Sequence, residues 1–137
     1  MSQACRKLSV VMPVYNAADY LNESISDLLV QSYSDFELIC VNDGSTDDSK
    51  KIIEDFCEKD NRIRLISQEN LGGGAARNAG FDESDSEYVL FLDADDRFED
   101  TLIEKIIKDA DQKKCDVLIF AADEFDYENR QLRLGVL

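Results

Sequence analysis

Short apolar runs alternate along the chain with apolar residues spaced three and four positions apart. A short continuous apolar run predicts a strand buried on both faces, whereas apolar residues spaced three and four positions apart predict an amphipathic helix. The runs predict five strands, at residues 8–15, 36–41, 63–67, 88–92 and 117–120. Strands that alternate with helices indicate βαβ units. We therefore expect one α/β domain, with a mostly parallel sheet and helices on both of its faces.

The segments between these runs carry helical spacing and start signals. Ser45 and Asp48, and again Thr101 and Glu104, have the spacing of a capping box. A run of three glycines at 72–74 leads into a helix of small residues. The remaining tail, from Asp123 on, has no clear period, and we expect the chain to be cut off there rather than finished. The inner faces of the long helices are expected to carry Leu21, Ile25, Leu28 and Leu29, then Ile52, Ile53, Phe56 and Cys57, then Leu102, Ile103, Ile106, Ile107 and Ala110.

Polar residues follow three of the predicted strands. Tyr15 and Asn16 follow the first strand, Asp43 the second and Asp93 the fourth. Ligands of open parallel sheets bind beyond the carboxyl ends of the strands, where the strand order reverses. If the second and fourth strands flank the first, these groups open onto one crevice.

The sequence Asp93-Ala94-Asp95-Asp96 directly after an apolar strand places several carboxylates at that edge. Like charges at this spacing repel each other, so the arrangement favours a cation among them. Hard oxygen ligands suit Mg²⁺ or Mn²⁺, whose shell is usually completed by water and substrate phosphates. Taken alone, such a cluster is more often a solvated acidic turn, because the chain holds 30 acidic residues.

Composition excludes several classes of function. The formal net charge of −15 argues against nucleic acid or an anionic membrane as the main partner. No apolar stretch is long enough to span a bilayer. The chain has no histidine, which removes Ser-His-Asp and Cys-His mechanisms. Its four cysteines are far apart, which predicts free thiols in a reducing compartment.

Two nucleotide-binding patterns are also absent. The loop after the first strand lacks the glycines of a dinucleotide-binding fold, and the glycines at 72–74 are not followed by Lys-Ser/Thr as in a P-loop. Arg77 could form an ordinary surface ion pair, or could reach a base carbonyl or a phosphate with two donors. Tyr15 could be a packing residue or a platform for a base.

Four motifs in order resemble a known family. They are Val14-Tyr15-Asn16, then Val41-Asn42-Asp43-Gly44-Ser45-Thr46-Asp47, then Asn70-Leu71-Gly72 with Ala76-Arg77-Asn78-Ala79-Gly80, and then Asp93-Ala94-Asp95-Asp96. Together they resemble the nucleotide-sugar-binding part of family 2 glycosyltransferases, over residues 8–121. The resemblance implies a Rossmann-like GT-A fold and a donor-binding domain at residues 1–121. Residues 122–137 would then begin the acceptor side.

The resemblance also implies a role for each matching residue. Tyr15 would lie against the nucleotide, and the backbone near Pro13 and Val14 would line the base pocket. Asp43 would accept a hydrogen bond from the base, typically uracil, and Arg77 would read a base carbonyl. The acidic motif would hold the rest of the donor. Asp93 would contact the ribose or the diphosphate, and Asp95 would bind a Mn²⁺ or Mg²⁺ ion. Asp93 and Asp96 are further candidate ligands of this ion.

Such enzymes transfer a sugar from a nucleotide-sugar, here a UDP-sugar, to an acceptor hydroxyl, usually with inversion. The family supplies its catalytic base and acceptor site beyond position 137, and nothing assigns that role to Asp123, Glu124 or Asp126. We expect a cytoplasmic location, with membrane association through a missing C-terminal part as an alternative. Two other functions stay open: a non-catalytic nucleotide-sugar-binding module, and a metal-dependent phosphatase. The phosphatase class needs its Asp-x-Asp on the first strand.

Overall fold

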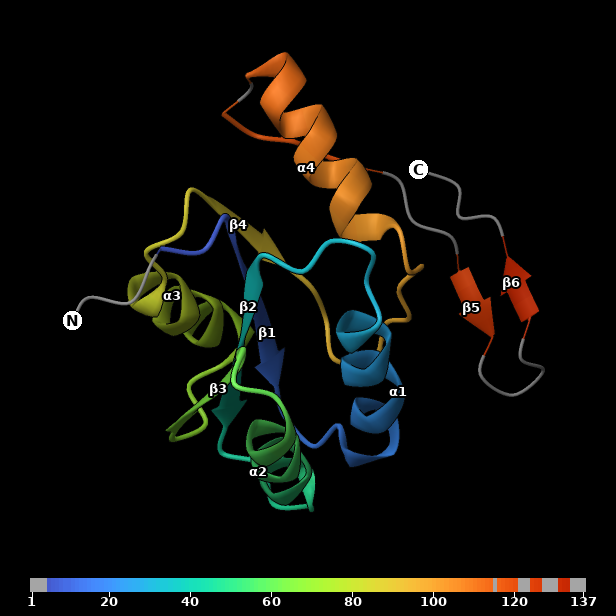
Figure 1. The fold of residues 1–137 in the computed structure, drawn as a ribbon. Helices are drawn as coiled ribbons and strands as arrows, with labels where there is room; N and C mark the ends of the chain where they lie inside the picture. The colour runs from blue at the N-terminus through green and yellow to red at the C-terminus, as the bar shows by residue number, and fades with distance from the viewer. Residues whose placement is uncertain (1–4, 115, 121–123, 127–130, 134–137) are drawn as a thin grey trace.

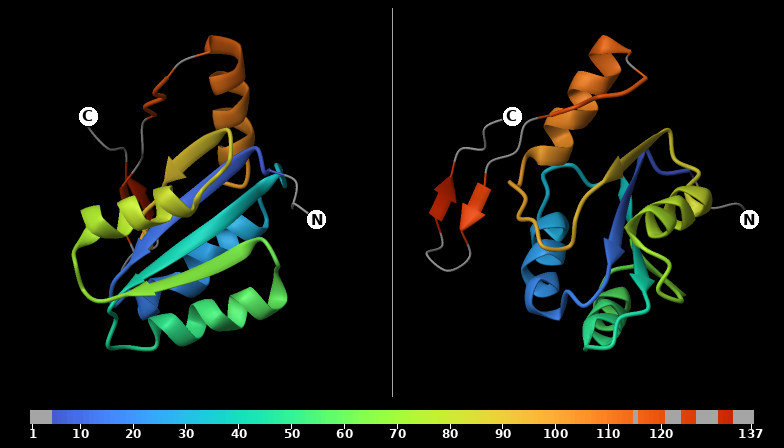
Figure 2. Two further views of the ribbon diagram at one scale, coloured as in Figure 1. Left: turned by 90° about the vertical axis from the view of Figure 1, so that its left-hand side faces the viewer. Right: turned by 180° about the vertical axis from the view of Figure 1, so that it is seen from behind.

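Four parallel strands form the central sheet of the computed structural model, which describes residues 5–114, 116–120, 124–126 and 131–133. The strand order is β3-β2-β1-β4, so β2 and β4 flank β1 as the crevice hypothesis requires (Figure 2). The strands are β1 (Leu8–Val14), β2 (Phe36–Asp43), β3 (Ile63–Gln68) and β4 (Tyr88–Phe91). Leu8 pairs with both Phe36 and Tyr88, which aligns the amino ends of the three strands.

The helices cover both faces of this sheet, and the expected α/β architecture is confirmed (Figure 1). They are α1 (Ala18–Leu29), α2 (Ser49–Lys59), α3 (Gly73–Glu83) and α4 (Leu102–Lys113). Alternate residues of β1 point to opposite faces. Val10 and Met12 belong to the larger core with α1, α2 and α4, whereas Val11 packs on the other face with Ala76 of α3. This two-sided burial explains why the strand is read as a continuous apolar run.

Helix α3 lies close against the sheet because its inner face is built of small residues. A Cβ atom added to Gly80 would collide with Cγ1 of Val11 and would lie 3.2 Å from Cγ2 of Val41. Ala76 is completely buried beside the same strands. The small residues therefore set the distance at which α3, with Arg77 on it, approaches the sheet.

The predicted fifth strand at residues 117–120 is wrong. These residues are irregular, and Val117 and Ile119 are 75% and 87% exposed. Their apolar sequence has strand propensity, but a strand also needs a hydrogen-bonded neighbour, and no described strand pairs with them. The tail instead contributes β5 (Glu124–Asp126) and β6 (Gln131–Arg133), an antiparallel pair that the sequence pattern did not predict.

The capping boxes also differ from expectation. Helix α2 begins at Ser49, and it is Asp47 whose Oδ1 accepts a hydrogen bond from the Ser49 amide, at 2.9 Å. Helix α4 does begin after Thr101, but that side chain makes no capping bond. The amide of Ile103 donates to Oε1 of Gln31 instead, at 3.0 Å. An acceptor from the segment after α1 thus replaces the local one.

Candidate functional site

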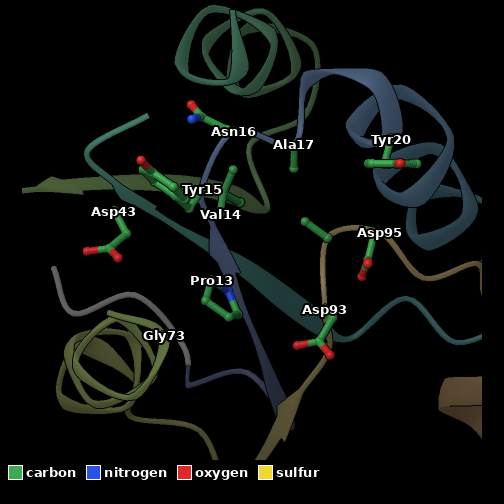
Figure 3. A pocket seen from close by; sticks show the side chains of 11 residues that line it. Pro13, Val14, Tyr15, Asn16, Ala17, Tyr20, Asp43, Gly73, Asp93 and Asp95 are labelled. Carbon is green, nitrogen blue, oxygen red and sulfur yellow. The ribbon is translucent and has the colours of Figure 1, made fainter. Parts of the chain in front are cut away.

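A pocket of about 420 Å³ opens at the carboxyl ends of β1, β2 and β4. It brings together the residues that the sequence places after these strands (Figure 3). Tyr15 and Asp43 lie on one side of Pro13, whereas Asp93 and Asp95 lie on the other side, with Asp95 toward Tyr20. The lining residues are Pro13, Val14, Tyr15, Asn16, Ala17, Tyr20, Asp43, Gly73, Asp93, Ala94 and Asp95. Asp43, Asp93 and Asp95 therefore share one pocket, as predicted.

Asp43 is a buried carboxylate held by three donors. Its Oδ1 accepts hydrogen bonds from Nε2 of Gln68 at 2.9 Å and from the amide of Leu71 at 2.8 Å. Its Oδ2 accepts one from the amide of Gly72 at 3.0 Å. Gly72 has a φ of +100°, which a residue with a side chain would adopt only with strain. The carboxylate thus fixes the turn that leads into α3.

These hydrogen bonds decide the ionisation of Asp43. The bond from Gln68, helped by those from the amides of Leu71 and Gly72, lowers the pKa of Asp43 although burial opposes the shift. The side chain is therefore an ionised acceptor at neutral pH. Each carboxylate oxygen can accept two hydrogen bonds, so Oδ2 has room for a donor from a ligand in addition to Gly72.

The loops after β1 and β2 are joined through Asn16. Its Oδ1 accepts hydrogen bonds from the amide of Thr46 at 2.8 Å and from the amide of Asp47 at 3.4 Å. Its own amide donates to Oγ of Ser45 at 3.0 Å. Asn16 has a φ of 48°, a conformation that asparagine tolerates better than most residues. This junction holds Tyr15, which is 51% exposed, at the mouth of the pocket.

Three carboxylates gather on the turn after β4. One ligand atom from each of Asp93, Asp95 and Asp96 lies within 4.8 Å of the others. The amide of Asp96 donates to the carbonyl oxygen of Asp93 at 3.2 Å, which closes the turn. The buried Ala94 separates the first two acids. The predicted crowding of acidic groups is thus present in the fold.

Arg77 supplies positive charge beside this cluster. Its Nη2 lies 3.3 Å from Oδ1 of Asp93, and both side chains are about half exposed. The guanidinium does not line the pocket itself. Burial, together with the charges of Asp95 and Asp93, raises the pKa of Asp96. The single charge of Arg77 does not balance the three carboxyl groups of the turn, which keeps an excess of negative charge.

The donor set fits a hard divalent cation. Three carboxylate oxygens can converge from one exposed turn, and exposed positions leave room for water and phosphate oxygens in the remaining coordination sites. No histidine or thiolate that would favour a softer metal belongs to this group of ligands.

The structure also bears on the predicted acceptor side, on the phosphatase alternative and on two residues that the sequence analysis missed. The proposed start of the acceptor side falls partly on residues outside the described ranges, including Asp123, and only the backbone is described for Glu124 and Asp126. The Asp-x-Asp motif follows β4 rather than the first strand, which does not suit the phosphatase alternative. The contacts of Asn16 and Gln31 were missed because both link segments that are far apart in the sequence.

Comparison with known proteins places the chain in a family. Residues 9–136 match the model of glycosyl transferase family 2, and the chain belongs to this family. It is 42% identical over 113 residues to the glycosyltransferase GlyG of Streptococcus pneumoniae, an alignment that covers 82% of this chain and 38% of GlyG.

Solved structures agree with this assignment. The crystal structure of S. aureus TarS 1–349 in complex with UDP matches with a TM-score of 0.72 and 30% identity, over 77% of this chain and 32% of that one. The mannosyltransferase PcManGT from Pyrobaculum calidifontis, in complex with GDP-Man and Mn²⁺, matches with a TM-score of 0.69 and 25% identity, over 77% and 33%. The fold is therefore the GT-A fold of these glycosyltransferases. The chain spans between about a third and two-fifths of the length of these proteins. None of the helices in the described ranges could cross a membrane.

Proposed function

We propose that this chain is the donor-binding part of an inverting, metal-dependent glycosyltransferase that uses a UDP-sugar. The observation that carries the proposal is the single pocket at the carboxyl edge of the sheet, where Asp43 lies on one side and Asp93 and Asp95 on the other. A nucleotide-sugar has a base that needs a hydrogen-bond acceptor and a diphosphate that needs positive charge. One side of the pocket offers the carboxylate of Asp43 as the acceptor, and the carboxylates on the other side would hold a divalent cation that supplies the positive charge.

The base end of the donor would lie between Tyr15 and Asp43. Oδ2 of Asp43 can accept an N–H of uracil beside the amide of Gly72, because it carries one described hydrogen bond. The exposed ring of Tyr15 can lie against the base, and the backbone of Pro13 and Val14 forms the adjoining wall. Arg77 would read a base carbonyl or contact phosphate only after its guanidinium turns from Asp93, 3.3 Å away.

The diphosphate would lie over the acidic turn. Asp95 would be the principal metal ligand, with Asp93 and Asp96 close enough to contribute. Asp93 would otherwise contact the ribose or the diphosphate. A bound Mn²⁺ or Mg²⁺ supplies Lewis-acid neutralisation of the charge on the departing nucleoside diphosphate. That PcManGT, which has a similar fold, was solved in complex with GDP-Man and Mn²⁺ supports the use of a divalent ion. The acceptor and the catalytic base are expected from the rest of a longer protein.

The test is calorimetric titration of UDP with and without Mn²⁺, using wild type and Asp95→Asn. We expect Mn²⁺ to tighten UDP binding in the wild type and Asp95→Asn to remove most of this gain, because a neutral amide is a weak ligand for a hard cation. A variant that keeps the full gain would contradict the metal assignment. Titration of GDP in parallel separates a uridine site from a guanosine site.

A further inference from the structure

A guanidinium joins the acidic turn to helix α1. Arg97 follows directly on Asp96, and its Nε and Nη2 donate to the two carboxylate oxygens of Asp27, at 2.7 Å and 3.1 Å. Its Nη1 donates to Oε2 of Glu23, one helical turn earlier, at 3.1 Å. A two-point contact between planar groups fixes orientation as well as distance.

The backbone next to Arg97 uses the same carboxylate. The amide of Phe98 donates to Oδ2 of Asp27 at 3.0 Å, so two consecutive residues of the loop are bound to one side chain of α1. The side chains of Asp27 and Arg97 are only 16% and 28% exposed. Partial burial makes this contact more rigid than a typical surface ion pair, which contributes little.

The segment directly after α1 holds the loop further along. Nε2 of Gln31 donates to the carbonyl oxygen of Glu99 at 2.6 Å, and the amide of Ser32 donates to the carbonyl oxygen of Asp100 at 2.8 Å. The segment between the acidic turn and α4 is therefore attached at several points to α1 and to the residues that follow this helix. Of these attachments, that of Arg97 is the nearest in sequence to Asp95 and Asp96.

We propose that Arg97 and Asp27 are positioning residues for the metal-binding carboxylates, an inference that rests on the proposed donor site. A divalent ion of the Mg²⁺ type demands a narrow geometry from its ligands. Three carboxylates on a free loop would repel each other and spread apart. The Arg97–Asp27 contact fixes the backbone one residue after Asp96, and thereby limits where the ligand atoms can go.

An effect of charge alone and a positioning role predict opposite changes in metal affinity when Arg97 is replaced, which makes the inference testable. Arg97 is already neutralised by the carboxylates of Asp27 and Glu23. Removal of its charge would make the surroundings of the turn more negative and would strengthen the attraction for a cation. If the role of Arg97 is positioning, Arg97→Met weakens metal binding despite the added negative potential. Arg97→Lys keeps the charge but cannot form the two-point contact, and it weakens binding too.

The experiment compares UDP affinity with and without Mn²⁺ for wild type, Arg97→Lys and Arg97→Met. Arg62→Lys is the matched control, because Arg62 also contacts a carboxylate, that of Asp60, through Nε and Nη2 at similar exposure but on the entry to β3. We expect the Mn²⁺-dependent gain in UDP affinity to fall about 10- to 100-fold in both Arg97 variants, the usual effect of residues behind metal ligands. UDP affinity without metal should stay within about twofold, and Arg62→Lys should behave as wild type.

The outcomes separate this inference from the proposed function. A wild type with no Mn²⁺-dependent gain refutes the metal site, and the inference falls with it. A wild type with the gain, and Arg97 variants that keep it or increase it, refutes the positioning role alone. Equal losses in Arg62→Lys would show general loosening of the fold and would also refute it. Circular dichroism of each variant verifies the native fold, and Arg97→Lys serves if Arg97→Met does not fold.

Discussion

Replacement of Asp43 by asparagine should destabilise the fold and weaken nucleoside binding at the same time. The side-chain shape is kept, but one carboxylate oxygen becomes an NH₂ group. If the remaining oxygen keeps its bonds from Gln68 and Leu71, the NH₂ group faces the amide of Gly72, which donated to Oδ2 at 3.0 Å. Two donors then oppose each other in a buried site.

The magnitude follows from these three hydrogen bonds. A buried N–H left without an acceptor costs about 1–3 kcal/mol, and a hydrogen bond loses roughly 1 kcal/mol when its acceptor is no longer charged. For Gly72, Gln68 and Leu71 together we expect the free energy of unfolding to fall by about 3–5 kcal/mol. Asp48→Asn is the control: Asp48 is exposed and its side chain makes no capping bond, so the change should stay within about 0.5 kcal/mol.

The effect should also depend on pH in a fixed direction. Because the pKa of Asp43 is lowered in the folded state, its carboxylate stabilises the fold above the unfolded-state value of 3.8. This contribution decreases as the pH falls below 3.8 and is lost as the pH passes through the lower folded-state pKa. The stability gap between wild type and Asp43→Asn should therefore be constant near neutrality and narrow in acid.

Urea unfolding followed by circular dichroism measures the stability gap, and calorimetry with uridine in the absence of metal measures binding. A gap below about 0.5 kcal/mol at pH 7 would refute the account of the three-donor carboxylate. Uridine affinity equal to that of the wild type would refute the role of Asp43 toward the base, even if the stability loss is found.

Two further variants test the packing and the loops. Gly80→Ala should lower the free energy of unfolding by about 1–3 kcal/mol, because the added Cβ collides with Val11. Gly74→Ala is the control and should be neutral or stabilising, because a Cβ added there has open space around it. Equal effects of the two substitutions on stability would contradict the close packing of α3. Asn16→Gly keeps the backbone conformation but loses the acceptor for the exposed amide of Thr46. We therefore expect about 0.5–1.5 kcal/mol of destabilisation and weaker UDP binding, both measured as above. An unchanged stability would show that the loop junction is unimportant.

The strands of the sheet could be predicted because each of them is recognisable from its own apolar residues. Buried parallel strands need apolar residues on both faces, so four of them could be located to within two residues at either end. Their order could only be assumed, yet the positions of Asp43 and Asp93 at strand ends implied a shared edge. The structure confirms both the order and the shared pocket.

Contacts between distant segments could not be predicted in this way. Nothing local marks Gln31 as the acceptor for the first turn of α4, 72 residues away, or Asn16 as the junction with Thr46. The predicted strand at residues 117–120 is wrong for the related reason that a strand needs a hydrogen-bonded neighbour. Local sequence gives propensity, whereas the partner is decided by the whole fold.

The small residues on the inner side of α3 have an effect that reaches beyond packing. Arg77 contacts Asp93 from the same helix, so its reach depends on how closely Ala76 and Gly80 allow α3 to approach the sheet. Related chains could thus alter the electrostatic potential in the pocket by exchanging methyl groups and hydrogens in the interior, with every polar residue of the pocket left in place.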